Sequence, residues 1–174
     1  MPTGSQDRQE DTTVGDTLLT LEDMQRFVGT EAPPHVLHVE KELVQRYVDA
    51  VQDDNPLWRD EDYAGATRWR HPIVPPYIFC ALMTITKYSP QTGAIPLPAP
   101  NVPLPRKNVL EGEETWEFFA PLRVGDITTS RVRLVDVKRR EGRLGEMFIM
   151  TYEADTVNQR GELVARSSNT IVNY

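Results

Sequence analysis

The chain has 174 residues, of which 26% are charged and 39% hydrophobic, and its formal net charge is −7 at neutral pH. This length and composition predict one globular domain with a core of its own. The acidic balance disfavours nucleic acids and anionic membranes as partners, because both attract a basic surface. A single cysteine, Cys80, cannot form an internal disulfide. We interpret it as a small core residue in a reducing compartment rather than as a nucleophile.

Residues 1–16 are polar and charged without an apolar period. They predict a disordered N-terminal tail ahead of a domain that covers residues 17–174. The tail lacks the basic and apolar pattern of a signal peptide, so we expect a cytoplasmic protein. No internal repeat or linker divides the rest of the chain.

The first half of the domain is predicted to be mainly helical. Thr20-Leu-Glu-Asp23 has the spacing of a capping box, which predicts the start of a short helix. Residues 36–39 can form a short strand. Apolar residues then recur at helical spacing over residues 40–51. A further short helix is expected over residues 60–69.

The stretch from residue 71 to residue 88 is the one that we expect the fold to be organised around. Pro75 and Pro76 suit the first turn of a helix, where a missing N–H costs nothing and a fixed φ is already helical. From Tyr77 onward, a helix with about 3.6 residues per turn would have no polar face, and a helix that is apolar all round is typically buried. The helix is too short to cross a bilayer, which takes about 20 apolar residues. We therefore expect a buried helix over residues 76–88, wrapped by the rest of the domain.

Residues 89–106 contain six prolines. Such a segment can be a polyproline ligand for a partner domain, or a crossing loop or flap on the surface. We favour the loop because the segment lies between core elements.

From Val109 onward the hydrophobic period changes to two, which is typical of strands with one buried face. Turn residues separate successive runs, and Gly161 is expected in a left-handed conformation in the last hairpin. The predicted strands cover residues 109–120, 127–139, 146–157 and 163–172. The fold class is therefore α+β, with a long antiparallel sheet curled around one buried helix.

The stretch whose residue types are best suited to catalysis or binding is Asp53-Asp54-Asn55-Pro56, at the break after the second predicted helix. Two carboxylates, an amide and a proline can form a capped, solvated turn, and composition alone favours that interpretation. The sequence contains no Ser/His/Asp arrangement, no glycine-rich phosphate loop and no Cys/His cluster, so we predict neither a metal nor a cofactor. His35 and His38 have no metal-ligand partner at useful spacing and are interpreted as surface residues.

The acidic turn also carries a family resemblance. It is similar to the Gly-Asp-x-Asn-Pro-x-His motif of the MaoC-like dehydratases and (R)-specific enoyl-CoA hydratases, in particular the N-terminal-type MaoC dehydratase domain. Asp53, Asn55 and Pro56 are in register with that motif, and Trp58 stands at the position of its histidine.

Other pieces of the chain resemble the same family in the same order. They match the start of its central helix, a loop–strand junction and its last hairpin, at residues 73–79, 122–126 and 158–165. The resemblance covers residues 27–174. It implies a single hot-dog domain, an antiparallel sheet wrapped around a long central helix, which agrees with the picture from hydrophobic periodicity.

The resemblance implies hydration of a trans-2-enoyl thioester, or the reverse dehydration of a 3-hydroxyacyl thioester, on coenzyme A or acyl carrier protein, as a lyase of lipid metabolism. In active members the motif aspartate and histidine hold and activate one water molecule. Asp53 is the corresponding candidate catalytic residue, but Trp58 cannot replace the histidine because indole does not accept a proton. N–H groups at the start of the central helix can donate to the thioester carbonyl. The candidate substrate-binding residues are Asn55, Trp58, Tyr77 and Ile78.

Three functions stay open at this point. In the favoured one, the chain is a subunit of a heteromeric hydratase or dehydratase whose MaoC-like partner carries the intact motif, as in other N-terminal-type members. In the second, it is a self-sufficient hydratase with Asp53 as the base and Tyr77 or a water in place of the histidine. In the third, it binds acyl thioesters without turnover. We expect a homo- or heteromeric dimer in each case, because edge-to-edge pairing removes exposed strand edges.

Overall fold

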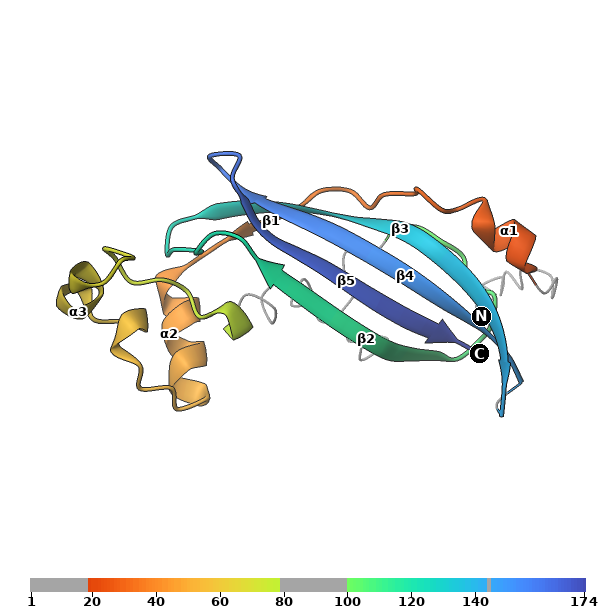
Figure 1. Ribbon diagram of the computed structural model, residues 1–174, viewed down its shortest axis with the longest axis horizontal. Helices are drawn as coiled ribbons and strands as arrows, with labels where there is room; N and C mark the ends of the chain where they lie inside the picture. The colour runs from red at the N-terminus through yellow and green to blue at the C-terminus, as the bar shows by residue number, and fades with distance from the viewer. Residues whose placement is uncertain (1–18, 79–99, 144) are drawn as a thin grey trace, which may run out of the picture.

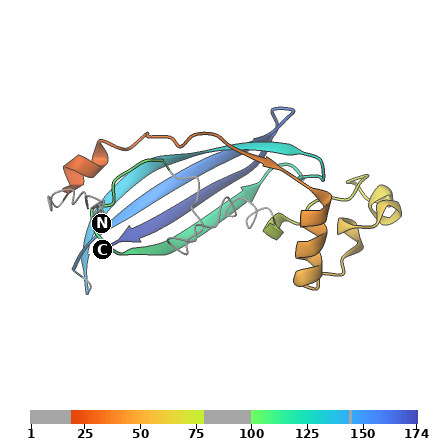
Figure 2. The ribbon, with the colours of Figure 1, turned by 180° about the vertical axis from the view of Figure 1, so that it is seen from behind.

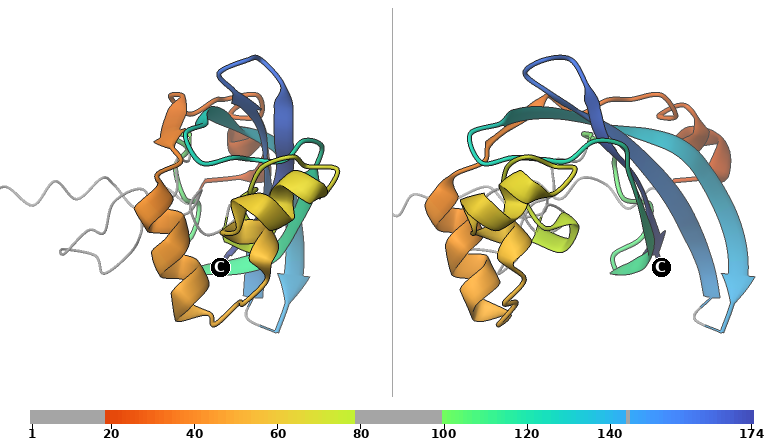
Figure 3. Two further views of the ribbon diagram at one scale, coloured as in Figure 1. Left: turned by 90° about the vertical axis from the view of Figure 1, so that its left-hand side faces the viewer. Right: turned by 60° about the vertical axis from the view of Figure 1, so that its left-hand side comes forward.

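The computed structural model describes residues 19–78, 100–143 and 145–174. They form one antiparallel sheet of five strands in the order β1-β3-β4-β5-β2 (Figure 1). The strands are β1 (His35–His38), β2 (Val109–Phe118), β3 (Ile127–Gly142), β4 (Gly145–Asn158) and β5 (Leu163–Asn173). The sheet is strongly curved, and α2 and α3 lie beyond one end of it (Figure 3).

The helices are short and flank the two ends of the sheet (Figure 1). They are α1 (Leu21–Gln25), α2 (Lys41–Ala50), the 3₁₀ turn η1 (Pro56–Trp58) and α3 (Glu61–Ala66). The predicted capping box is present at α1, where the Thr20 hydroxyl accepts from the Asp23 N–H and the Asp23 carboxylate accepts from the Thr20 N–H. Among the described residues, no helix is long and apolar enough to cross a membrane.

The segment between α1 and β1 runs along the β3 edge of the sheet (Figure 2). The Gly29 N–H donates to the Leu134 carbonyl at 2.8 Å, and the Ala32 N–H donates to the Val132 carbonyl at 2.8 Å. Met24 of α1 is thereby packed into a core cluster on the sheet. Its other buried members are Leu134, Val137, Phe148, Met150 and Tyr152.

Alternation along β3 and β4 decides which side chains enter the core. Ser130 and Leu134 of β3 are buried, while Arg131 between them is exposed. A bulge between Leu134 and Asp136 then shifts the register, so that Val137 also faces the core.

A second core cluster lies where the sheet meets α2 and the start of the predicted central helix. It joins Val44 and Val48 of α2 to Val164 of β5 and to Ile78, whose exposure is 0%. Val44 and Val48 of the predicted apolar side of α2 therefore join the core at the end of the sheet, whereas Leu43 and Val51 are exposed.

The α+β class and the four long antiparallel strands are confirmed, and Gly161 has the expected left-handed φ of 78°. The central helix is described only at residues 76–78, which are helical. The remainder of that helix, Cys80, the tail over residues 1–16 and most of the proline-rich segment lie outside the described residues. The predictions for them stay predictions.

Candidate functional site

The turn after α2 is built by local capping. Gln52 adopts a left-handed φ of 56°, which turns the chain sharply away from the helix axis. Asn55 has an extended backbone before the following proline, and its side chain caps η1 by accepting from the Leu57 N–H at 3.0 Å. The capped-turn interpretation of this stretch is therefore correct for Asn55.

Asp53 is held inside this turn by three hydrogen-bond donors. Its Oδ1 accepts from the Asn55 N–H at 3.0 Å. Its Oδ2 accepts from the Trp58 Nε1–H at 2.9 Å and from the Tyr77 hydroxyl at 2.6 Å. The hydrogen bond from Tyr77, followed by those from Asn55 and Trp58, lowers the pKa of Asp53 below its usual value. A carboxylate offers about four lone-pair positions, so these three donors leave about one position, on Oδ1, for a water.

Tyr77 keeps its proton at neutral pH. Burial, and then the hydrogen bond and negative charge of Asp53, raise the pKa of Tyr77 to about 12. Its ring lies 6.2 Å from that of Tyr47, centroid to centroid, at a tilt of 39°. Tyr77 is therefore a fixed donor to Asp53 and a poor general base.

Trp58 packs against the core cluster and points its indole N–H at the carboxylate. Arg59 fastens the same turn, since it pairs with Asp49 at 3.2 Å and donates to the Asp53 carbonyl at 3.3 Å. The structure thus brings together Asp53, Trp58 and Tyr77, and places Asn55 beside them as a cap. Arg59 has no counterpart in the sequence predictions, because no periodic or motif signal distinguishes it.

Ile78 occupies a different position from the other candidates. Its side chain is fully buried in the core cluster, and its N–H donates to the Pro75 carbonyl at 3.0 Å. A role for Ile78 in binding a substrate carbonyl stays a prediction, and in this conformation its N–H is already used.

A small apolar pocket of about 180 Å³ lies next to the start of the central helix. Ile73 and Pro76 line one side of it, and the end of β2 with Phe118 and Phe119 lines another. Both phenylalanines are about half exposed, at 44% and 54%. The pocket suits an apolar group of modest size.

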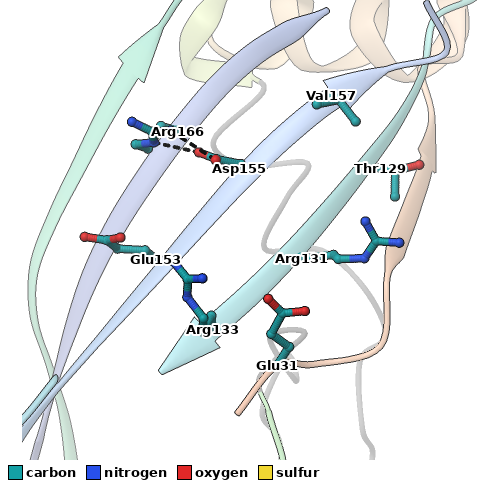
Figure 4. Close-up of a pocket in the computed structure, with 8 residues that line it drawn as sticks. All are labelled: Glu31, Thr129, Arg131, Arg133, Glu153, Asp155, Val157 and Arg166. Atoms are coloured by element: carbon teal, nitrogen blue, oxygen red, sulfur yellow. Dashed lines mark hydrogen bonds and ion pairs between the residues drawn. The ribbon is translucent and has the colours of Figure 1, made fainter. Parts of the chain in front are cut away.

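A larger groove of about 440 Å³ lies on the face of the sheet opposite the core (Figure 4). Arg166 and Asp155 point toward each other there and form two hydrogen bonds, of 2.6 and 3.0 Å. Arg131 lies opposite Asp155 in the strand register, and Arg133 lies opposite Glu153. With Glu31 included, three arginines face three carboxylates, so this groove is a charge-balanced, solvated sheet face.

Among the described residues, no group of three or more His, Cys, Asp or Glu side chains is arranged to hold a metal ion.

Comparison with known proteins agrees with this fold. The family model described as the FAS1-like dehydratase domain region matches residues 26–167. A UPF0336 protein of Saccharopolyspora erythraea is 28% identical over 149 residues, covering 85% of this chain and 89% of that protein.

Two solved structures illustrate the structural similarity. The MaoC-like dehydratase of Rhodospirillum rubrum is 22% identical, with a TM-score of 0.63, and the match covers 90% of this chain and 97% of that one. The HadBC 3R-hydroxyacyl-ACP dehydratase complex of Mycobacterium tuberculosis is 19% identical, with a TM-score of 0.63, and the match covers 84% of this chain and 97% of that one. The chain therefore belongs to the family of FAS1-like dehydratase domain regions, and its domain is a MaoC-like hot-dog.

Proposed function

We propose that this chain is a subunit of an enoyl-thioester hydratase or 3-hydroxyacyl-thioester dehydratase and works with a MaoC-like catalytic partner. The observation that carries the proposal is the contact of Trp58 with Asp53. Hydration across a double bond needs a base and an acid within reach of one water. Here the carboxylate accepts from three protein donors, and the indole can donate but never take up a proton.

The free edge of the sheet supports the assembly part of the proposal. β2 is the last strand in the order and pairs only with β5 among the described strands. Leu110 and Phe118 are about half exposed along it. The unpaired backbone N–H and C=O groups of an edge strand are a template for pairing with another sheet. HadBC, which has a similar fold, is a complex named as a dehydratase.

In this proposal the substrate is an acyl-CoA or acyl-carrier-protein thioester. Trp58 and Tyr77 are the candidate binding residues that reach the surface, while Asn55 caps the turn that carries Trp58. The apolar pocket beside Phe118 is of a size to take part of an acyl chain.

The self-sufficient hydratase is the second candidate, and the Tyr77–Asp53 hydrogen bond of 2.6 Å is the observation that favours it. Its weakness is the pKa of Tyr77, about 12, which keeps the phenol from exchanging a proton readily near neutral pH. A thioester-binding protein without turnover is the third candidate, and the same experiment separates all three.

The test follows the loss of enoyl absorbance of a trans-2-enoyl-CoA. The chain is assayed alone and with the MaoC-like protein that co-purifies with it from its host, each with wild-type chain and with Asp53→Asn. We expect turnover only with the partner, and little effect of Asp53→Asn on the complex. Robust turnover by the chain alone that collapses in Asp53→Asn would overturn the proposal in favour of the self-sufficient hydratase. Thioester binding without turnover in either setting would favour the third candidate.

A further inference from the structure

The edge strand β2 is long and open to solvent. It has ten residues, whereas a typical strand has about 5–6, and among the described strands it pairs only with β5 (Figure 1). Every residue of β2 except Trp116 is exposed. Edge strands that avoid pairing are often very short, or carry lysine or proline, and β2 contains neither residue. Its length therefore suits pairing with another strand.

A local irregularity interrupts β2 without ending it. The register with β5 shifts between Glu111 and Glu114, and pairing then continues as far as Phe118. At the shift the Glu113 N–H donates to the Thr170 hydroxyl at 2.7 Å. This hydrogen bond turns one N–H group inward, and β2 keeps its pairing with β5 on both sides of the shift.

The middle of β2 is acidic. The strand contains four glutamates and no Lys, Arg or His. The glutamates are Glu111, Glu113, Glu114 and Glu117. No cation in the described part of the chain forms an ion pair with any of them, and Arg166, opposite Glu117 in the register, forms its ion pair with Asp155. Glu111 accepts from the side-chain N–H of Asn169, a neutral donor, at 3.2 Å. The exposed edge therefore carries a row of negative charge.

The two ends of β2 are apolar. Val109 and Leu110 at its start are about half exposed, and so is Phe118 at its end. Apolar contacts at both ends stabilise pairing with many strands and distinguish poorly between them. The charges between these ends therefore decide which strand is accepted.

A second copy of this chain fits this edge poorly. Pairing about a twofold axis sets the strand antiparallel to itself, so that each residue type faces the same surface of the other copy. A pair centred on Glu113 or Glu114 sets that residue against its own copy and gathers the four glutamates of each strand in one interface. Like charges directly opposite destabilise a strand pair, whereas opposite charges stabilise it.

We propose that β2 docks the edge strand of a different hot-dog subunit whose facing strand is basic, and that its glutamates reject a second copy of this chain. The proposal rests on the proposed function, because that function supplies the MaoC-like partner. Backbone hydrogen bonds and the apolar ends of β2 hold the partner, and complementary charge selects it.

The experiment measures self-association and partner binding of the full-length chain by analytical ultracentrifugation. The test variant combines Glu111→Lys with Glu114→Lys. The matched control combines Glu42→Lys with Glu141→Lys, at exposed positions outside β2. Each change adds two charges, so both double variants carry −3 in place of −7 (−7 + 2 + 2). Thermal melts verify that each variant is folded, and the salt dependence of the wild type needs no variant.

The first expected result concerns this chain by itself. At about 50 mM salt, where charges are weakly screened, an equal mixture of wild type and test variant should form a mixed dimer. That dimer should be at least tenfold tighter than the self-association of either protein. A mixture of wild type with the control variant should show no such gain.

The second expected result concerns the MaoC-like protein that co-purifies with the chain. The test variant should bind it at least tenfold more weakly than the wild type does, and the control variant should bind it like the wild type. Raising the salt from about 50 to 500 mM should weaken the wild-type complex, because salt screens the charge pairs.

Three results would overturn the inference. They are a mixed dimer no tighter than the wild type's self-association, equal partner affinity of the test and control variants, and a wild-type complex that is insensitive to salt. If the complex turns over enoyl thioester and the test variant binds the partner as tightly as the wild type, the inference fails and the proposed function stands. If the mixed dimer forms as expected but no partner supports turnover, the charge selectivity of β2 is supported and the proposed function fails.

Discussion

Asp126 gives the sharpest test of how the loop beside the candidate site is held. Its side chain is 4% exposed, and its carboxylate accepts from the Arg123 N–H, the Gln159 side chain and the Arg160 guanidinium, each at 2.9 Å. The perturbation is Asp126→Ala, which removes the acceptor and leaves the three donors in place.

The expected loss in the free energy of unfolding depends on whether each donor finds another acceptor once the carboxylate is removed. Gln159 and Arg160 are exposed and can turn to water, and Arg160 retains its pair with Glu162. The backbone N–H of Arg123 cannot move away, and a hydrogen bond to a charged group contributes about 1.5–3 kcal/mol. With about 0.5 kcal/mol for each exposed partner, the expected loss in the free energy of unfolding is about 2.5–4 kcal/mol.

The assay is urea unfolding followed by tryptophan fluorescence at pH 7. The matched control is Asp136→Ala on β3, the strand that follows Asp126, which loses only an exposed pair with Lys138 and should stay within about 0.5 kcal/mol of wild type. A loss below about 1 kcal/mol for Asp126→Ala, or equal losses for both variants, would refute the reasoning.

The same carboxylate predicts a pH dependence. Burial alone would raise the pKa of Asp126, but the hydrogen bonds from Gln159, the Arg123 N–H and Arg160 outweigh it, so that the pKa is lowered. A carboxylate with a depressed folded-state pKa stabilises the fold above its unfolded pKa of about 3.9, and this stabilisation is lost as the pH falls through the folded value. The difference between wild type and Asp126→Ala should therefore be constant from about pH 6 to 8 and shrink below about pH 4.

Three further predictions follow from the core and the site. Leu134→Ala should cost about 2–5 kcal/mol in urea unfolding because it leaves a cavity in a closed core, whereas Leu104→Ala, 51% exposed, should cost little; similar losses would contradict the core assignment. Tyr77→Phe should remove the tyrosinate absorbance step near pH 12 and raise the pKa of Asp53 toward its ordinary value, measured by carboxyl-carbon NMR; an unmoved Asp53 would show that their hydrogen bond is absent in solution. Trp58→His should give the chain alone at least tenfold more enoyl-CoA hydration than Trp58→Phe, since imidazole can exchange a proton. Equal rates would contradict the interpretation that the chain lacks a catalytic histidine at position 58.

Local chemistry made much of the fold predictable from the sequence. A period of two requires only that alternate residues face one side of a sheet, so the long strands β2 to β5 were predicted in order and nearly at their ends. The capping box at Thr20 and the left-handed Gly161 were predictable because both depend on residues within one turn.

Other features of the sheet depend on how its strands pair, and the sequence of a single strand does not predict them. The bulge after Leu134, which returns Val137 to the core, is defined by pairing with β4. The apolar positions of β3 do change from Val132 and Leu134 to Val135 and Val137 there, but the sequence alone does not show that the cause is a bulge. The place of β1 beside β3 was equally hidden, since a strand of four residues carries too little pattern to choose its partner.

The candidate site likewise has residues that the sequence identified and contacts that only the structure shows. Asp53, Asn55 and Trp58 are close in the chain, so motif register alone identified them and the substitution at the histidine position. The hydrogen bond from Tyr77 spans 24 residues. A neighbouring pocket of about 320 Å³ is lined both by Lys41, at the start of α2, and by Arg123 of the β2–β3 loop. Only the tertiary structure could bring these groups together, because their proximity is decided by how α2 and the loop pack against one end of the sheet, and sequence spacing does not encode that packing.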